Sequence, residues 1–277
     1  MAKKALIVGI NYLGTPNRLH GCVNDANNVY KLLTAHFGFD PANVVMLLDS
    51  HATTTNILNE LNNLVSNPQK GDILYFHYSG HGSQIPAVNG KHGGVNNIIC
   101  PVDLDWETKM IADYQLKEIF DRVPHGVSAT LFLDCCHSGT DLDQANIYQP
   151  HLSSTRIIRT ELPNDRYIDP PQEMIDKMQG CVSQKVSIQS RDVNDSVLLI
   201  AGCRASETSA DAFVDGTYQG AATCALNTLL IQSNFKMSYQ TIIDQMAVFM
   251  AQNGYEQHPE LDGSPVLFST NYLESFQ

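Results

Sequence analysis

The chain has 277 residues, of which 43% are hydrophobic and 17% are charged. This composition is typical of a globular protein and not of a disordered one. The formal net charge of −12 argues against sequence-independent nucleic-acid binding, which depends on Lys and Arg contacts to phosphate. The acidic chain suits partners that carry basic groups.

The seven cysteines are odd in number and contain no CxxC pair, which indicates reduced thiols in a cytosol-like compartment. Met1-Ala-Lys-Lys leads directly into an apolar run, so we expect no signal peptide and a cytoplasmic location. No apolar run approaches the roughly 20 residues that span a bilayer. A membrane partner is therefore not expected.

The first half of the chain alternates predicted strands and helices. Buried apolar runs predict strands over residues 4–10, 43–48, 72–78, 98–102 and 128–133. Amphipathic patterns predict helices over residues 22–37, 53–65 and 113–122. This order predicts an α/β fold with a mostly parallel central sheet and helices on both faces.

The pattern lapses over residues 140–195, which contain several prolines and no long periodic element. Such a segment inside a compact domain is expected to be functional or mobile, and we predict only a short helix near residues 172–178. Regular structure is expected to resume with a strand over residues 196–202. Helices over 220–231 and 238–252 and a final strand over 265–268 follow.

Reactive side chains follow two of the predicted strands. Residues 72–78 lead into His81 and Gly82, and residues 128–133 lead into Cys135 and Cys136. Because α/β proteins place ligands at the carboxyl ends of parallel strands, these side chains can face one site. A thiol and an imidazole form a nucleophile with its base, and the N–H of Gly82 can bind the oxyanion.

Each of these residues also has a structural interpretation. A single cysteine after a strand is usually a small buried hydrophobic residue, and a single histidine usually fills a hydrogen-bonded structural role. His137 beside Cys135 and Cys136 suggests a metal site. Adjacent residues on an extended chain point apart, however, whereas zinc ligands converge. We therefore predict a catalytic site without a metal.

The residues around both strand ends resemble a known family. His77-Tyr-Ser-Gly-His81-Gly82 and Asp134-Cys-Cys136-His-Ser-Gly139 are similar to the two active-site motifs of metacaspases, the caspase-like cysteine peptidases. Supporting similarities occur at residues 4–12, 19–26, 99–103 and 200–211, so the resemblance covers residues 4–139 and 196–268. The compact chain is most similar to the bacterial members, called orthocaspases.

The resemblance implies a caspase–haemoglobinase-like three-layer sandwich formed by residues 1–277 as a single domain. Residues 1–139 correspond to the large-subunit region, 140–195 to a linker and 196–277 to the small-subunit region. The family's site places the nucleophile at Cys136 and the base at His81. It also implies cleavage of peptides and proteins after Arg or Lys by a monomer or weak dimer.

The family's pocket for the basic side chain maps to Cys22, Asp25, Ser79 and Asp134. A physical argument agrees, because two carboxylates can bind a guanidinium through charge-assisted hydrogen bonds. Taken singly, Asp25 is also explained as a first-turn helix carboxylate and Asp134 as a strand-end cap.

Calcium, which activates many eukaryotic members of the family, is not expected to matter here. Residues 91–97 carry no carboxylate, and only Asp113 stands where the family has an Asp-Asp pair. Calcium prefers several anionic oxygens. Asp103, Asp105 and Asp113 remain, so we expect weak or absent calcium dependence and no cofactor.

The linker holds basic residues at which an Arg/Lys-directed peptidase can cut itself. The candidates are Arg156, Arg159 and Arg166, followed by Lys185 and Arg191, with Arg156 or Arg159 favoured. The alternative interpretation is that these residues are solvated loop charges. Two other readings of the whole chain stay open: a non-catalytic caspase-like scaffold, and a legumain-like or gingipain-like peptidase, for which secretion signals and disulfides are expected.

Overall fold

A computed structural model describes residues 1–87, 95–136, 164–178, 195–204, 207–214 and 216–276. Its central sheet has six strands in the order β12-β9-β7-β3-β1-β2. In chain order these strands are β1 (Lys3–Gly9), β2 (Val44–Leu48), β3 (Ile73–Ser79), β7 (Ser128–Asp134), β9 (Val197–Ala201) and β12 (Glu260–Gly263). All neighbours run parallel except β12, which is antiparallel to β9.

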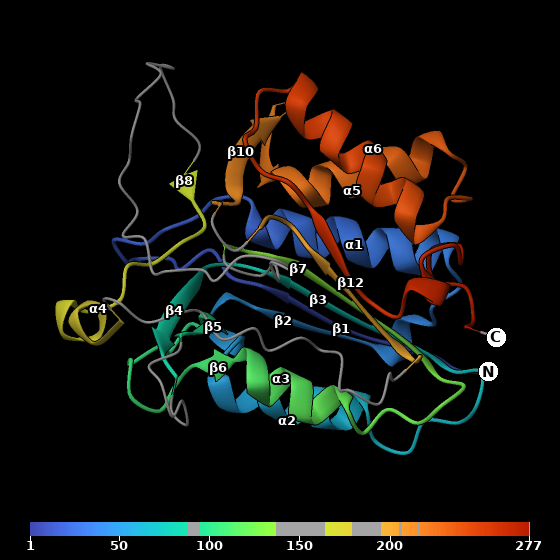
Figure 1. Ribbon diagram of the computed structural model, residues 1–277, viewed down its shortest axis with the longest axis horizontal. Coiled ribbons are helices and arrows are strands. Elements are labelled where there is room, and N and C mark those ends of the chain that lie inside the picture. The colour runs from blue at the N-terminus through green and yellow to red at the C-terminus, as the bar shows by residue number, and fades with distance from the viewer. Residues whose placement is uncertain (88–94, 137–163, 179–194, 205–206, 215, 277) are drawn as a thin grey trace.

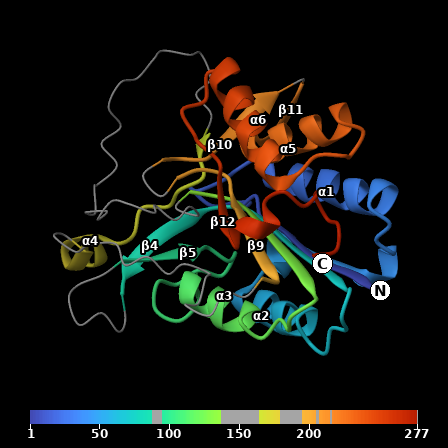
Figure 2. The same cartoon turned by 45° about the vertical axis from the view of Figure 1, so that its right-hand side comes forward.

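Helices cover both faces of this sheet and give the molecule three layers (Figure 1). One face carries α1 (Cys22–His36), α5 (Ala221–Gln232) and α6 (Tyr239–Gln252), and the other carries α2 (Thr54–Leu64) and α3 (Asp113–Phe120). The central strands are largely apolar because both of their faces are buried, and every residue of β3 and β7 is buried. Figure 2 shows the same layers from a second direction.

Two small sheets lie at the end of the main sheet that is opposite the chain termini (Figure 1). One contains β4 (Gly82–Pro86), β5 (Val95–Ile99) and β6 (Ile111–Ala112), all antiparallel. The other contains β8 (Asn164–Asp165), β10 (Ala210–Val214) and β11 (Thr217–Gly220). A short helix, α4 (Gln172–Met178), lies next to β4.

The predicted fold class is confirmed, and every predicted helix forms with its ends within two residues of the expected ones. Two strand predictions are wrong. The run at 98–102 does not join the main sheet, because β5 ends at Ile99 and pairs with β4 and β6. The run at 265–268 is a 3₁₀ turn led by Pro265, which has no N–H for a ladder.

The predicted irregular linker contains order in its described part, since β8 and α4 both fall within residues 140–195. The hairpin of β10 and β11 has no counterpart in the predicted elements. Among the described residues, no helix has both the length and the apolar composition that crossing a membrane requires.

Candidate active site

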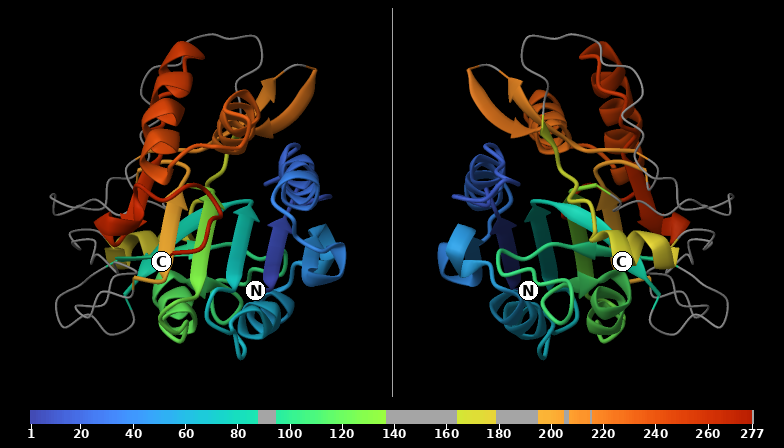
Figure 3. Two further views of the ribbon diagram at one scale, coloured as in Figure 1. Left: turned by 90° about the vertical axis from the view of Figure 1, so that its right-hand side faces the viewer. Right: turned by 90° about the vertical axis from the view of Figure 1, so that its left-hand side faces the viewer.

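Neighbouring strands bring the two predicted catalytic segments together. β3 and β7 are paired in parallel, with Ser79 opposite Asp134 at their carboxyl ends. His81 and Cys136 each follow two residues later, and they are 3% and 0% exposed. Parallel pairing in matched register is the reason that two motifs far apart in sequence lie at one edge of the sheet. Figure 3 shows this edge from both sides of the molecule.

The imidazole of His81 is fixed by its surroundings. Its Nε2 lies 2.7 Å from the carbonyl oxygen of Asn17, which assigns the ring proton to Nε2. Nδ1 is thereby left as an acceptor, and it has no hydrogen-bond partner among the described residues. Burial lowers the pKa of His81 to about 4. The ring is therefore neutral near pH 7, as a general base must be.

A pair of tyrosines holds the backbone of His81. The N–H of His81 donates to the hydroxyl oxygen of Tyr12 over 3.0 Å, and the hydroxyl of Tyr78 donates to the His81 carbonyl over 2.7 Å. The Tyr12 ring also contacts the imidazole, with ring centroids 4.7 Å apart. These contacts fix the backbone of His81 and place the Tyr12 ring against the imidazole.

The thiol of Cys136 faces β10. The backbone N–H of Ser209 donates to Cys136 Sγ over 3.1 Å. Burial raises the pKa of the Cys136 thiol well above its ordinary value, so the group is a neutral thiol in this conformation. Catalysis by Cys136 therefore requires that its proton be removed as it attacks, because the thiolate is the nucleophile.

Two backbone N–H groups converge on one carbonyl oxygen, that of Arg166. Gly82 donates to it over 3.0 Å and Cys136 over 3.3 Å. A Cβ atom at Gly82 would overlap the carbonyl oxygen of Cys136, so only glycine fits this approach. The pair of donors is the arrangement that stabilises an oxyanion in acyl transfer, and Arg166 presents its peptide carbonyl to it.

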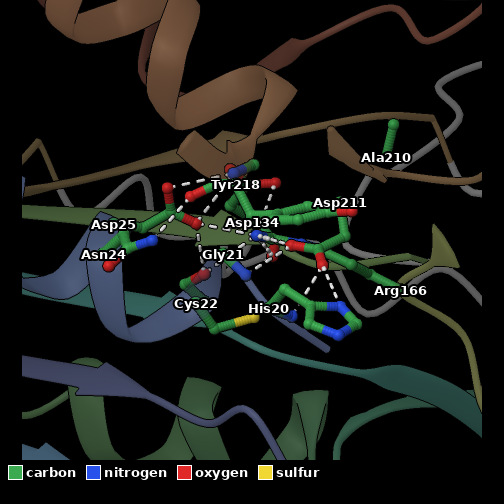
Figure 4. Close-up of polar contacts among 12 residues, drawn as sticks. His20, Gly21, Cys22, Asn24, Asp25, Asp134, Arg166, Ala210, Asp211 and Tyr218 are labelled. Atoms are coloured by element: carbon green, nitrogen blue, oxygen red, sulfur yellow. Dashed lines mark hydrogen bonds and ion pairs between the residues drawn. The ribbon is translucent and has the colours of Figure 1, made fainter. Parts of the chain in front are cut away.

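The side chain of Arg166 is fully buried within three carboxylates, which we call the acidic cluster (Asp25, Asp134 and Asp211; Figure 4). Nη2 of Arg166 lies 2.7 Å from Asp25 and 3.1 Å from Asp211, while Nη1 lies 3.3 Å from Asp134. Nη1 also donates to Ser79 Oγ over 2.8 Å. Each Nη atom thus contacts two side chains of this site.

The acidic cluster carries more negative charge than Arg166 neutralises. Burial raises the pKa of Asp25 to about 6, even though the guanidinium opposes this shift. Burial also works against the charge of Asp134, but Arg166 and hydrogen bonds from Thr223 and Ser209 hold the pKa of that carboxyl below its usual value. Three buried carboxylates strongly favour a cation between them.

All four residues predicted for the basic pocket lie at this site. Asp25 and Ser79 are joined by a 2.7 Å hydrogen bond, and Asp134 and the buried Cys22 lie beside them. Asp211 was not among the predicted site residues, although it stands in the 200–211 segment of the family resemblance. Its carboxylate also accepts hydrogen bonds from the N–H groups of His20 and Gly21. His137, Arg156 and Arg159 lie outside the described residues.

Comparisons with known proteins agree with this geometry. Residues 3–145 match the family described as the metacaspase, peptidase C14 domain. The chain is 32% identical to metacaspase-1 of Candida glabrata, with 95% of this chain and 72% of that protein covered. It is 40% identical to metacaspase-4 of Arabidopsis thaliana over 52% of this chain and 35% of that protein.

Two crystal structures share the fold. A protein of Geobacter sulfurreducens superposes with a TM-score of 0.68 at 23% identity, with both chains covered in full. Caspase-1 of Spodoptera frugiperda superposes with a TM-score of 0.54 at 12% identity, covering 95% of this chain and 85% of that one.

A caspase-like sheet with this family's sequence defines a cysteine-type peptidase that acts on peptide or protein substrates. The chain belongs to the metacaspase family. This assignment favours an enzyme over the non-catalytic scaffold.

Proposed function

We propose that the protein cleaves peptide bonds after arginine and that it cuts its own chain between Arg166 and Tyr167. The observation that carries the proposal is the placement of Arg166. Its side chain fills the acidic cluster while its carbonyl oxygen accepts from Gly82 and Cys136. A substrate arginine requires both contacts at once.

The reaction follows from these positions. Cys136 Sγ attacks the carbonyl carbon of Arg166 as His81 Nδ1 takes the thiol proton. The oxygen becomes an oxyanion held by the two backbone N–H groups. His81 then gives the proton to the nitrogen of Tyr167, and the carbon–nitrogen bond breaks. Water, deprotonated by His81, hydrolyses the thioester and frees the carboxylate of Arg166 and the thiol.

Arginine is expected to be preferred over lysine. The guanidinium reaches Asp25 and Asp211 through Nη2, and Asp134 and Ser79 through Nη1. A lysine ammonium is a single point charge and cannot span two such groups from one planar fork. Lysine substrates should be cleaved with lower kcat/KM.

The residues before the scissile bond are also bound in a way that places Arg166 at the cleavage site. The N–H of Arg166 donates to the Ser209 carbonyl over 2.9 Å, and β8 pairs with β10 just before it. Arg166 is thus held as a strand on the amino side of the scissile bond. The other predicted self-cleavage residues lie outside the described ranges.

We also infer that activity does not require calcium. The remaining carboxylates are each occupied by backbone donors: Asp103 accepts from Thr54, Asp105 from the N–H groups of residues 107–109, and Asp113 from two N–H groups. Burial also raises the pKa of Asp113 to about 7, so its carboxyl is partly protonated at neutral pH. These side chains do not fit a calcium site, which needs several free anionic oxygens.

Purified protein tests the proposal directly. The wild type should convert to two fragments, the second beginning at Tyr167, at equal rates with calcium and with a chelator. Cys136→Ala should stay intact, and Arg166→Lys should convert more slowly than the wild type. Processing of Cys136→Ala in isolation, or a second fragment with a different first residue, would contradict the assigned site. A strict calcium requirement would refute the calcium inference.

A further inference from the structure

The segment that follows the scissile bond packs against the small β4–β5–β6 sheet. From Asp165 onward, burial alternates: Arg166, Ile168 and Pro170 are buried, whereas Asp165 and Asp169 are exposed. This two-residue period is that of an extended strand with one face against the protein. The residues that the protein covers are therefore those at the scissile arginine and at the second and fourth positions after the bond.

The backbone of Ile168 is bound on both sides. Its N–H donates to the carbonyl of Gly82 over 3.1 Å, and its carbonyl accepts from Ser83 Oγ over 2.6 Å. Gly82 also forms a parallel bridge with Tyr167. Strand addition of this kind fixes the backbone and directs alternate side chains towards the protein.

The side chain of Ile168 enters an apolar cluster on the small β4–β5–β6 sheet. The cluster contains Ile85, Ile98, Cys100 and Ala112, which are at most 3% exposed, and Ile168 itself is 8% exposed. Partly buried apolar residues close its rim: Leu104, Trp106, Met110, Tyr114 and Met174. The described side chains that form the cluster are apolar, so burying a charged group among them costs free energy.

We infer that the cluster of Ile85, Ile98, Cys100 and Ala112 is a substrate subsite for an aliphatic side chain at the second position after the scissile bond. The inference rests on the proposed cleavage after Arg166. It extends recognition beyond the arginine to the pattern Arg-x-aliphatic. Substrates with a charged residue at this second position are disfavoured.

Quenched fluorogenic peptides test the subsite. The parent peptide is Asn-Asp-Arg-Tyr-Ile-Asp-Pro-Pro, the sequence of residues 164–171. Replacing its isoleucine by aspartate should lower kcat/KM about ten- to a hundredfold, and alanine should give an intermediate loss. The matched control replaces the following aspartate, whose counterpart Asp169 is exposed, by asparagine. Its kcat/KM should stay within about twofold of the parent.

A reporter with arginine followed directly by a fluorophore separates the two proposals, because it has no residue for the subsite. If the reporter is cleaved and the peptides with isoleucine, alanine and aspartate at the second position have equal kcat/KM, the subsite is refuted while cleavage after arginine stands. If neither reporter nor peptides are cleaved, both are refuted. The chain itself gives a second measurement: Ile168→Asp should slow conversion at Tyr167 about tenfold or more, and Asp169→Asn should not. Equal rates for these two variants would refute the subsite.

Discussion

Replacing Asp25 by Asn should weaken cleavage after arginine by a modest and calculable amount. Asp25 lies 2.7 Å from Nη2 of Arg166, so a large loss is the first expectation. Burial, however, raises the pKa of Asp25 to about 6 with the arginine in place. At pH 7 this carboxylate is only about one pKa unit from neutrality, and neutralising it costs on the order of 1 kcal/mol.

The replacement by Asn should change the free energy of the free enzyme much less than that of the enzyme with arginine bound. Without the guanidinium, the influence that lowers the pKa of Asp25 is gone while burial and the neighbouring Asp134 still raise it, so the free site favours the neutral carboxyl. A neutral Asn then resembles the free state and disturbs only the bound one. The whole cost, on the order of 1 kcal/mol, should appear as a roughly tenfold lower kcat/KM for an arginine peptide.

The assay compares arginine and citrulline peptides on the wild type and on Asp25→Asn. Citrulline keeps the shape of arginine without its charge, so the ratio of the two kcat/KM values should fall about tenfold in the variant. Asp121→Asn is the control, because Asp121 forms only a surface ion pair with Lys117, and its ratio should match the wild type. An unchanged ratio in Asp25→Asn, or an equal loss for both peptides, would refute the electrostatic account.

Two further predictions concern acid stability and the choice of cleavage site. Burial lowers the pKa of His77 to about 4. Below about pH 6.5 the imidazole is therefore protonated in the unfolded chain and still neutral in the folded chain. The free energy of unfolding consequently decreases as the pH falls towards 4. His77→Phe should therefore lose less thermal stability between pH 7 and 4.5 than the wild type; an identical loss contradicts this assignment. Arg166→Ala should abolish the cut before Tyr167 and favour the next Arg-x-Ile sequence, Arg156-Ile157-Ile158, over Arg159, whose second following residue is Glu161. Mass spectrometry of the fragments measures this choice, and preferred cutting at Arg159 would count against the subsite.

The strand ends could be predicted from sequence because their signal is local. Continuous apolar runs that stop at Gly-flanked polar residues define β3 and β7, and parallel neighbours necessarily end at the same edge. The helices were equally predictable, since periodicity and caps such as Thr53 mark their ends. The strand ends alone predicted His81 and either Cys135 or Cys136 near one site, and the family resemblance was needed to choose Cys136.

The parts that were missed depend on contacts between distant segments. β12 has the sequence Glu-Leu-Asp-Gly, which has low strand propensity, and it forms because β9 offers an open edge. Asp211 joins Asp25 only because the β10–β11 hairpin folds over the start of α1, where Gly21 and His20 donate to it. No spacing in the sequence indicates that a linker arginine supplies the cation for these carboxylates.

One residue, Gly82, ties the two recognition elements together. The N–H of Gly82 binds the Arg166 carbonyl, and the carbonyl of Gly82 binds the N–H of Ile168. A slip of one residue would turn every side chain of the segment to the opposite face. It would direct Tyr167 towards the acidic cluster and Asp169 towards the apolar one. The buried carboxylates and the apolar cluster therefore both disfavour this shifted register. An arginine and an aliphatic residue two positions later are consequently recognised together.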